Sequence, residues 1–515
     1  MIKNSYTRYN FIFISILFSF LILLNYTFKI PNDGVLYLSS AKFLLENNAL
    51  IDVTRTIDEN VRAFPTTQIG STLILSVLLF FFKFFWIAVY IIILTLIWTS
   101  LLKKLYRFSY DNIINKKIYS IILPLLIFFN YDYLISASSF YNEAFYYPCL
   151  IFSFLKINNY IKKDRNFFDK SILFSIFLCI GIIFRIQHIV FLSAFAIYLL
   201  IQKKYKDFLI VAFIGIINIV ILIFINQYLS GFEISKFAVN ETGNNVLSYF
   251  KVFFSSFYNS NINLELDNSN LLFKNIKVHL ALYSNFLNIP KIVDITLPNN
   301  LSKLDELIYF AFSFLVIFFL IRYFLKFKLS KFKVFLLIYL IFTSVFLFFL
   351  TDLISRYFLF TNFCIIYFLI DYFKNKKFKI STTTRYSISI VFFVSILLLY
   401  GSSYFFNYKK NTYSLLKELN EFKLNRKSFF SENEIFITRY RYHVKWILNK
   451  PSINVRNFNN HYTFDTNKRY FFIGKKEEFY DPEFYSTFKN VKNLEYYLYN
   501  NVEQESALIW RINLK

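Results

Sequence analysis

The chain has 515 residues, of which 56% are hydrophobic and 17% charged, with a mean hydropathy of +0.45 and a net charge of +25. Soluble globular proteins average about 45–50% apolar and about 25% charged residues, so this composition excludes an ordinary cytosolic protein. The basic charge does not indicate a nucleic-acid partner, because most of it lies in short loops between apolar runs, as in the cytoplasmic loops of membrane proteins.

Eleven apolar runs are long enough, or nearly so, for a bilayer core, which needs about 20 residues per helix. They cover residues 10–29, 84–102, 117–137, 143–160, 170–187, 189–203, 208–229, 306–325, 333–350, 356–373 and 385–406. No small-residue cleavage site follows the first run, so we interpret it as an uncleaved span. The sequence therefore predicts a polytopic α-helical membrane protein of about eleven transmembrane helices.

The distribution of Lys and Arg predicts the orientation of these spans. Basic residues gather in alternate loops, at 103–117, 156–170, 203–207, 322–333 and 374–385, while the short loops between them hold almost none. The positive-inside rule then places these loops and the N-terminus in the cytoplasm. A further apolar run at 69–82 would invert every later loop if it crossed the membrane. We therefore expect it to lie in the outer interface, with Lys83 at the headgroups.

This topology places loops 30–83 and 230–305 and the tail 407–515 outside the cytoplasm. The tail has a polar, helix-like start at 413–422, then the strand-like segments FFSENEIFITRY and KRYFFIGK and a closing ALIWRINLK. That mixture predicts a small extracytoplasmic α/β domain after a transmembrane domain of residues 1–406.

Two acidic residues lie where this topology reaches the outer membrane face. Asp33 follows the first span in the turn-forming Asn-Asp-Gly, and Glu143 begins the fourth span. Each has a structural interpretation, Asp33 as the N-cap of a surface helix and Glu143 as a carboxylate favoured by a helix dipole. The functional interpretation is that a carboxylate so close to hydrocarbon faces a cavity or a partner.

Basic residues reach the same face. Arg185 and His188 lie three residues apart on one helical face, and Arg356-Tyr357 opens a late span one turn after Asp352. Arg185 pairs with Glu143, or extends its charged end toward the membrane surface, or binds a phosphate through its planar fork of donors. His188 alone is more often structural, and Asp352 and Arg356 have the i,i+4 spacing of a local pair. Together, the carboxylates and cations suit an anionic lipid-linked substrate and an acid/base step.

These motifs resemble the GT-C class of integral membrane glycosyltransferases, which includes protein O-mannosyltransferases and the aminoarabinose transferase of lipid A. In that class an acidic residue opens a long outer loop, as Asp33-Gly34 does here, and a proline-containing segment similar to RAFPTTQIGSTLIL leads into an interfacial helix. Tyr141-Asn142-Glu143 matches a second acidic position before the fourth span. Arg185 matches an arginine of a middle span, and Arg356-Tyr357 an Arg-Tyr opening a late span. The resemblance covers about residues 1–405.

The resemblance implies transfer of a sugar from a polyprenyl-phosphate carrier to a glycan, lipid or protein acceptor outside a bacterial cytoplasmic membrane. Asp33 would act as general base or orient the acceptor hydroxyl, and Glu143 would help to position acceptor or donor. The lipid phosphate would be held, and stabilised as leaving group, by residues drawn from Arg185, His188, Arg62, Arg356 and Tyr357. No cofactor is predicted. No metal site is predicted either, because Asp33 is a single carboxylate and not part of an Asp-Asp or Asp-Glu pair.

Two other functions stay open. A surface-polysaccharide polymerase or ligase would use basic residues in a late outer loop, but loop 230–305 has lysines and one histidine and no arginine. A flippase or transporter of lipid-linked sugars would place ionisable residues near mid-bilayer, whereas these spans carry almost no charge away from their outer ends. No P-loop, GxGxxG or kinase motif indicates a nucleotide substrate.

Overall fold

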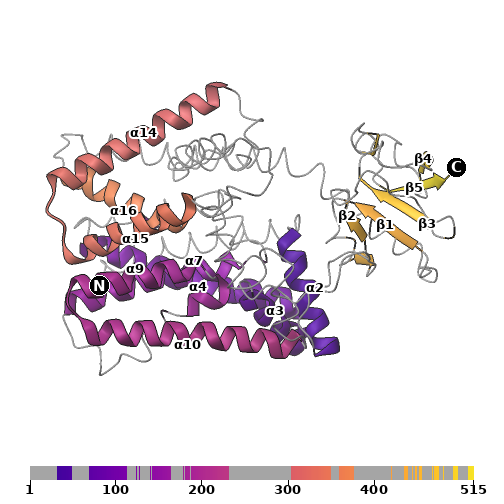
Figure 1. The fold of residues 1–515 in the computed structure, drawn as a ribbon, viewed down its shortest axis with the longest axis horizontal. Helices are drawn as coiled ribbons and strands as arrows, with labels where there is room; N and C mark the ends of the chain where they lie inside the picture. Colours follow the sequence, from indigo (N-terminus) through magenta and orange to yellow (C-terminus); the bar gives the residue numbers. More distant parts are fainter. Residues whose placement is uncertain are drawn as a thin grey trace, which may run out of the picture.

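The computed structural model of the protein describes residues 32–48, 69–112, 142–163, 180–185, 187–230, 303–348 and 359–375, the strands between 434 and 514, and a few single positions between them. Figure 1 shows their arrangement, with long helices followed in the sequence by a small sheet.

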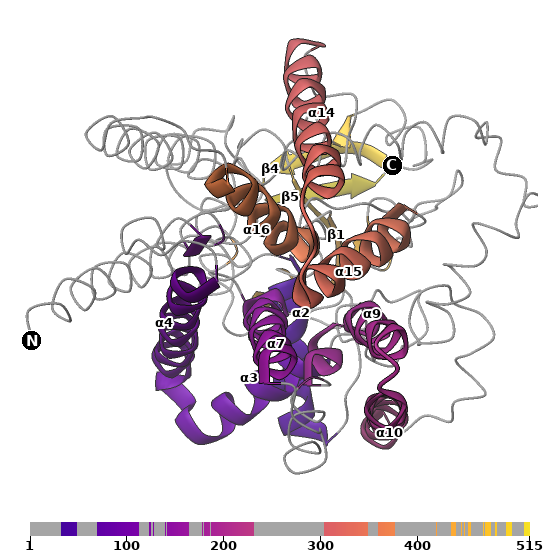
Figure 2. The ribbon, with the colours of Figure 1, turned by 90° about the vertical axis from the view of Figure 1, so that its left-hand side faces the viewer.

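Helices make up most of the described chain (Figure 1). They are α2 (Asn32–Asn47), α3 (Ile69–Phe82), the 3-10 turn η3 (Lys83–Phe85), α4 (Trp86–Asn112), α7 (Glu143–Lys163), α9 (His188–Ile201), α10 (Tyr205–Ser230), α14 (Lys303–Lys326), α15 (Lys331–Phe348) and α16 (Leu359–Asn375). Figure 2 views several of them nearly end-on: α7 packs on α4 and α15, α9 on α10 and α15, and α16 on α14 and α15. The shorter α2 and α3 pack on each other.

Aromatic side chains hold this bundle together. Phe154 of α7 stacks on Phe363 of α16 with ring centroids 4.8 Å apart, and contacts Phe191 of α9 at 5.1 Å and Tyr339 of α15 at 5.0 Å. Four helices therefore meet around one buried ring. Such pairs contribute about 0.5–1.5 kcal/mol each beyond the burial of their area.

The prediction of about eleven transmembrane helices is wrong for the described part of the chain. Two helical stretches there are long and apolar enough to cross a membrane, Ile69–Asp111 and Tyr205–Leu222. The predicted span 189–203 forms α9, whose 14 residues extend about 21 Å, less than the roughly 30 Å of a bilayer core. The predicted span 143–160 falls in α7, which contains Pro148 and ends in KINNYIKK. The predicted spans 10–29, 117–137, 170–187 and 385–406 lie wholly or mostly outside the described residues.

The physical reason is that hydropathy does not distinguish a side chain facing lipid from one facing a neighbouring helix. The first part of α2, interpreted from the sequence as part of a surface helix, is buried instead, with Val35, Tyr37 and Leu38 fully enclosed. The inner faces of α7, α9, α15 and α16 likewise belong to one hydrophobic cluster. Much of the apolar composition is thus used inside the protein.

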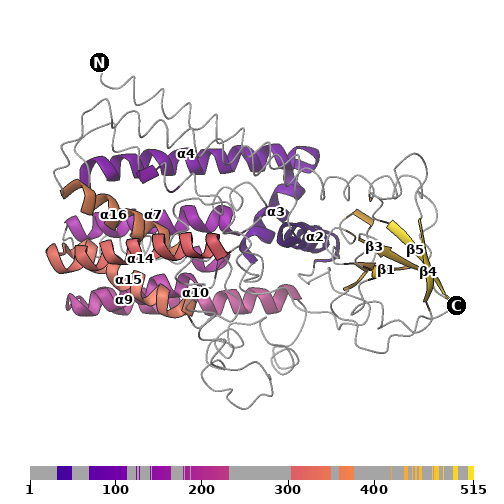
Figure 3. The ribbon, with the colours of Figure 1, turned by 90° about the horizontal axis from the view of Figure 1, so that it is seen from above.

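The apolar run 69–82 is also joined differently from the prediction. α3 passes through η3 directly into α4, so that 69–82 and 84–102 belong to one candidate span. Lys83 stands in the turn with a positive φ of 39°, and the helix axis changes direction there (Figure 3). Phe84 and Phe85 beside it are 94% and 73% exposed. The prediction that Lys83 lies at the headgroups is not tested by this geometry.

The C-terminal segment forms a mixed five-stranded sheet in the order β2-β1-β3-β5-β4. Its strands are β1 (Glu434–Thr438), β2 (Ser452–Asn454), β3 (Arg469–Ile473), β4 (Val491–Tyr496) and β5 (Ile509–Leu514). β2, β1 and β3 are parallel, and β5 is antiparallel to β3 and β4. Thr438 Oγ1 donates a 2.8 Å hydrogen bond to the Ile473 carbonyl and Trp510 Nε1 a 3.0 Å bond to that of Gly474, which join the ends of the strands.

β1, β3 and β5 lie within the segments FFSENEIFITRY, KRYFFIGK and ALIWRINLK. β2 and β4 had no counterpart in the sequence analysis. Of the helix-like start at 413–422, only Leu419 is described, and it is helical. The domain boundary between residues 406 and 407 stays a prediction.

A buried polar junction links α14, α15 and α16. Asp371 of α16 accepts a hydrogen bond from Tyr323 of α14 at 2.7 Å and pairs with the Lys333 ammonium of α15 at 2.7 Å. The side chains of Lys333 and Asp371 are only 17% and 6% exposed. Removal of one charge would leave the other buried without its counter-ion.

Asp371→Leu should lower the free energy of unfolding by about 3 kcal/mol, because it strands the Lys333 ammonium. The double variant Asp371→Leu/Lys333→Met should recover most of that loss, since an apolar pair replaces the ion pair. Denaturant unfolding of the full chain in neutral detergent measures both. A double variant as unstable as the single one would contradict this account.

Candidate functional site

The start of α7 is fixed by Asn142. Its backbone carbonyl accepts hydrogen bonds from the amides of Phe145 at 3.1 Å and Tyr146 at 2.9 Å, as an N-cap residue does. Its side-chain Oδ1 accepts a 3.0 Å bond from the Ser71 amide of α3, 71 residues away in the chain. Asn142 therefore caps α7 and ties it to the beginning of α3.

Glu143, the next residue, forms an ion pair with Arg185. Arg185 Nη2 donates to Glu143 Oε1, and the two side chains are 2% and 0% exposed. The Arg185 amide bonds to the Gly181 carbonyl at 3.0 Å, and the Arg185 carbonyl accepts from the His188 amide at 3.0 Å. Arg185 thus lies between the helical residues 181–184 and α9, opposite the start of α7. Of the alternatives for Arg185, pairing with Glu143 is the one seen.

His188 is the first residue of α9 and is buried beside aromatic rings. Its ring lies 5.0 Å from that of Phe191 and 5.6 Å from that of Tyr146, and Nε2 contacts the Leu178 carbonyl. α9 lies outside the two candidate spans. Burial lowers the pKa of His188 to about 4, although the Leu178 carbonyl opposes this shift. The imidazole is therefore neutral at physiological pH, which favours its structural interpretation over phosphate binding.

Two glycines allow these segments to approach closely. A Cβ on Gly181 would lie 2.5 Å from His188 Nδ1, and one on Gly70 would lie 2.6 Å from Phe184 Cδ1 and 2.9 Å from the Ile183 carbonyl oxygen. Both approaches are shorter than side chains tolerate. Neither glycine was singled out from the sequence, although a chain with only 8 glycines makes each of them informative.

Buried hydroxyl groups accompany the ion pair. Ser39 of α2 and Ser71 and Thr72 of α3 have side-chain oxygens that are enclosed and make no hydrogen bond within the described part of the chain. The two helices pack on each other, and α3 is tied to Asn142. These hydroxyls were not predicted from the sequence. The pattern that marks them is the pair of motifs LSSA and GST within otherwise apolar runs.

The remaining predicted residues are placed only in part. The backbone of Asp33 lies in the first turn of α2, but its side chain is outside the described residues. Arg62, Arg356 and Tyr357 are also outside them. The structure therefore brings together Glu143, Arg185 and His188. The expectation that Asp33 shares their site stays a prediction.

In comparisons with known proteins, no family model matches the chain and no curated protein matches it significantly. The resemblance to GT-C glycosyltransferases therefore rests on the short motifs given above. Among the residues that the structure describes, no three His, Cys, Asp or Glu side chains gather closely enough to hold a metal ion.

Gly181→Ala should destabilise the protein by about 1–3 kcal/mol, because the added methyl group overlaps the enclosed His188 ring. Gly215→Ala is the matched control. Gly215 lies inside α10 and its nearest neighbour to an added Cβ is Leu192 Cδ1 at 3.9 Å, so alanine fits. The control should gain up to about 1 kcal/mol from helix propensity. Unfolding of both variants in one detergent measures the difference, and equal effects would argue against the close approach.

Proposed function

We propose that the protein is a membrane-bound glycosyltransferase that moves a sugar from a polyprenyl-phosphate carrier to an acceptor outside a bacterial cytoplasmic membrane. The observation that carries this proposal is the enclosed Glu143–Arg185 pair at the start of α7. The pair joins two of the residues to which the family resemblance assigns a role in binding or positioning the substrates.

Stability alone gives little reason for this pair. Desolvating two charges costs several kcal/mol, and apolar residues of similar size stabilise an interior as well or better. An ionisable residue within an apolar membrane protein is by default a functional hypothesis. A guanidinium is also suited to phosphate, because its planar donors match two phosphate oxygens at once.

The chemistry assigns one task to each group. The donor phosphate takes the place of Glu143 on Arg185, and the released carboxylate helps to hold the sugar or the acceptor. The acceptor hydroxyl attacks the anomeric carbon while the bond from that carbon to the phosphate oxygen breaks. Arg185 stabilises the departing polyprenyl phosphate, and Asp33 takes the proton of the hydroxyl. The hydroxyls of Ser39, Ser71 and Thr72 are of the type that bonds to sugar hydroxyls.

Exposed apolar helix surfaces support a membrane location. Only 17% of the most apolar part of Ile69–Asp111 and 22% of that of Tyr205–Leu222 is buried. Along α10, Leu209, Phe213 and Ile216 are 63%, 65% and 61% exposed. Contiguous apolar surface of this kind marks contact with lipid or with another protein. A lipid-linked donor would reach the enzyme from that surface.

Asp33→Asn should lower glycosyl transfer by roughly 10²–10⁴-fold if its carboxylate is the general base. Folding should change little, because Asn keeps the size and much of the hydrogen bonding of the Asp side chain. Glu46→Gln is the matched control on α2, since Glu46 pairs only at the surface with Lys42, at 3.6 Å. Purified full-length variants are assayed with a defined polyprenyl-phosphate sugar and acceptor. Near-normal turnover of Asp33→Asn would contradict the catalytic assignment.

Arg185→Lys tests phosphate binding separately. It keeps the charge that faces Glu143 but loses the planar fork, so KM for the lipid donor should rise more than kcat falls. A fall in kcat with unchanged KM would contradict donor binding by Arg185. If the purified chain moved lipid-linked sugar across vesicles and transferred none, the flippase alternative would replace this proposal.

A further inference from the structure

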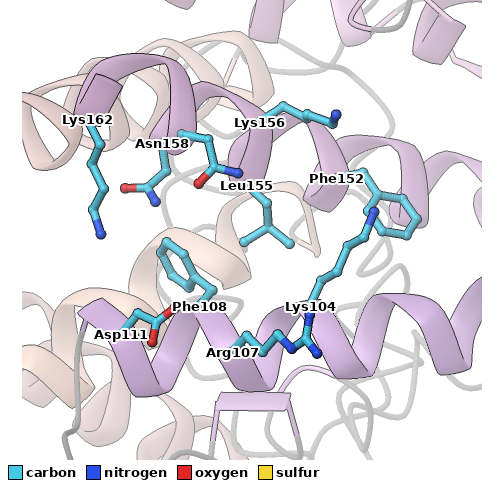
Figure 4. A pocket seen from close by; sticks show the side chains of 10 residues that line it. Lys104, Arg107, Phe108, Asp111, Phe152, Leu155, Lys156, Asn158 and Lys162 are labelled. Atoms are coloured by element: carbon cyan, nitrogen blue, oxygen red, sulfur yellow. The ribbon is translucent and has the colours of Figure 1, made fainter. Parts of the chain in front are cut away.

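A basic cavity lies between α4 and α7. It has a volume of about 320 Å³, and two cations from each helix line it (Figure 4): Lys104 and Arg107 of α4, and Lys156 and Lys162 of α7. Asp111 is the one carboxylate among its lining residues. Figure 4 shows Lys104 and Lys162 reaching from the two helices into the space between them.

This cavity is distinct from the site around Glu143. Lys156 follows Glu143 by 13 residues in α7, which corresponds to about 20 Å along the helix axis. Its lining residues include none of those assigned to glycosyl transfer. A ligand here would contact the opposite end of α7.

The cavity combines apolar walls with polar donors. The Lys104 ammonium lies 4.6 Å from the centre of the Phe152 ring, so this side chain is held in position. Phe108 and Leu155 are buried beside it, and Asn158, only 4% exposed, adds an amide. Arg107 brings five N–H donors in a planar fork.

The positive-inside rule accounts for many Lys and Arg residues in this part of the chain, but not for their convergence on one cavity. Like charges brought together from two helices repel each other, and a bound anion offsets that repulsion. Four cations against one carboxylate suit an anion of more than one charge, and Arg and Lys are the usual ligands of phosphate. We propose that this cavity binds a phosphate-bearing ligand. The proposal goes beyond the proposed glycosyl transfer and does not depend on it.

Two kinds of ligand carry such a phosphate group, a soluble phosphate compound and an anionic phospholipid headgroup. The first arm of the test titrates the full-length protein in neutral detergent with inorganic pyrophosphate by calorimetry. The second arm measures by native mass spectrometry how much phosphatidylglycerol, compared with phosphatidylcholine, the protein retains from mixed micelles. Each arm uses Lys104→Gln/Lys156→Gln and a control that also loses two charges, Lys103→Gln/Lys328→Gln. Both control lysines are exposed and lie outside the cavity.

Loss of the two cavity lysines should weaken binding by roughly tenfold or more, and the control by less than about twofold, since charges that contact the ligand act far more strongly than exposed, screened charges outside the cavity. Asp111→Asn should act in the opposite direction and tighten binding by about two- to fivefold, because it removes a like charge from the lining. A gain of affinity cannot arise from misfolding.

Binding of pyrophosphate with this pattern of variants supports a soluble ligand, and selective retention of phosphatidylglycerol with the same pattern supports a lipid headgroup. The proposal is overturned if neither probe binds, if the control double variant loses as much as the cavity variant, or if Asp111→Asn weakens binding. Circular dichroism confirms the helical content of each variant before the comparison.

Discussion

Burial of two opposite charges constrains the centre of this protein. Glu143 and Arg185 are almost fully enclosed, and neither charge can recover the hydration it has lost. The pair therefore needs a fixed geometry. Asn142 sets the first turn of α7, Gly181 makes room for His188 at the start of α9, and Gly70 brings α3 against residues 183–184. Together, these contacts keep the two charged side chains opposite each other.

The sequence predicted local features well. The strand-like segments FFSENEIFITRY and KRYFFIGK contain β1 and β3, and the closing ALIWRINLK contains β5, while the turn signal Asn32-Asp33-Gly34 lies in the first turn of α2. Glu143 and Arg185 stood out because charges are rare beside apolar runs, and their pairing was one of the alternatives for Arg185. The number of spans was wrong because Phe154, Phe191 and Phe363 raise hydropathy in the same way whether a ring faces lipid or another ring.

The features that the sequence did not yield depend on distant contacts. Asn142 and Ser71 are 71 residues apart, and Glu143 and Arg185 are 42 apart. No local sequence pattern spans so many residues. Gly70 and Gly181 matter because Phe184 and His188, respectively, lie directly opposite them. β2 has three residues, too few for a period to show, and β4 has an irregular register between Val491 and Asn493.

The helices and the sheet have separate hydrophobic clusters with no residue in common. Each cluster is therefore expected to melt as its own cooperative unit, so unfolding of the whole chain departs from a two-state transition. Trp98 is enclosed in the helical cluster and Trp510 in that of the sheet. The fluorescence of Trp98 therefore reports unfolding of the helical cluster, and that of Trp510 reports unfolding of the sheet. A calorimetric trace of the intact chain would then contain two overlapping heat-absorption peaks, with a van't Hoff enthalpy smaller than the calorimetric one.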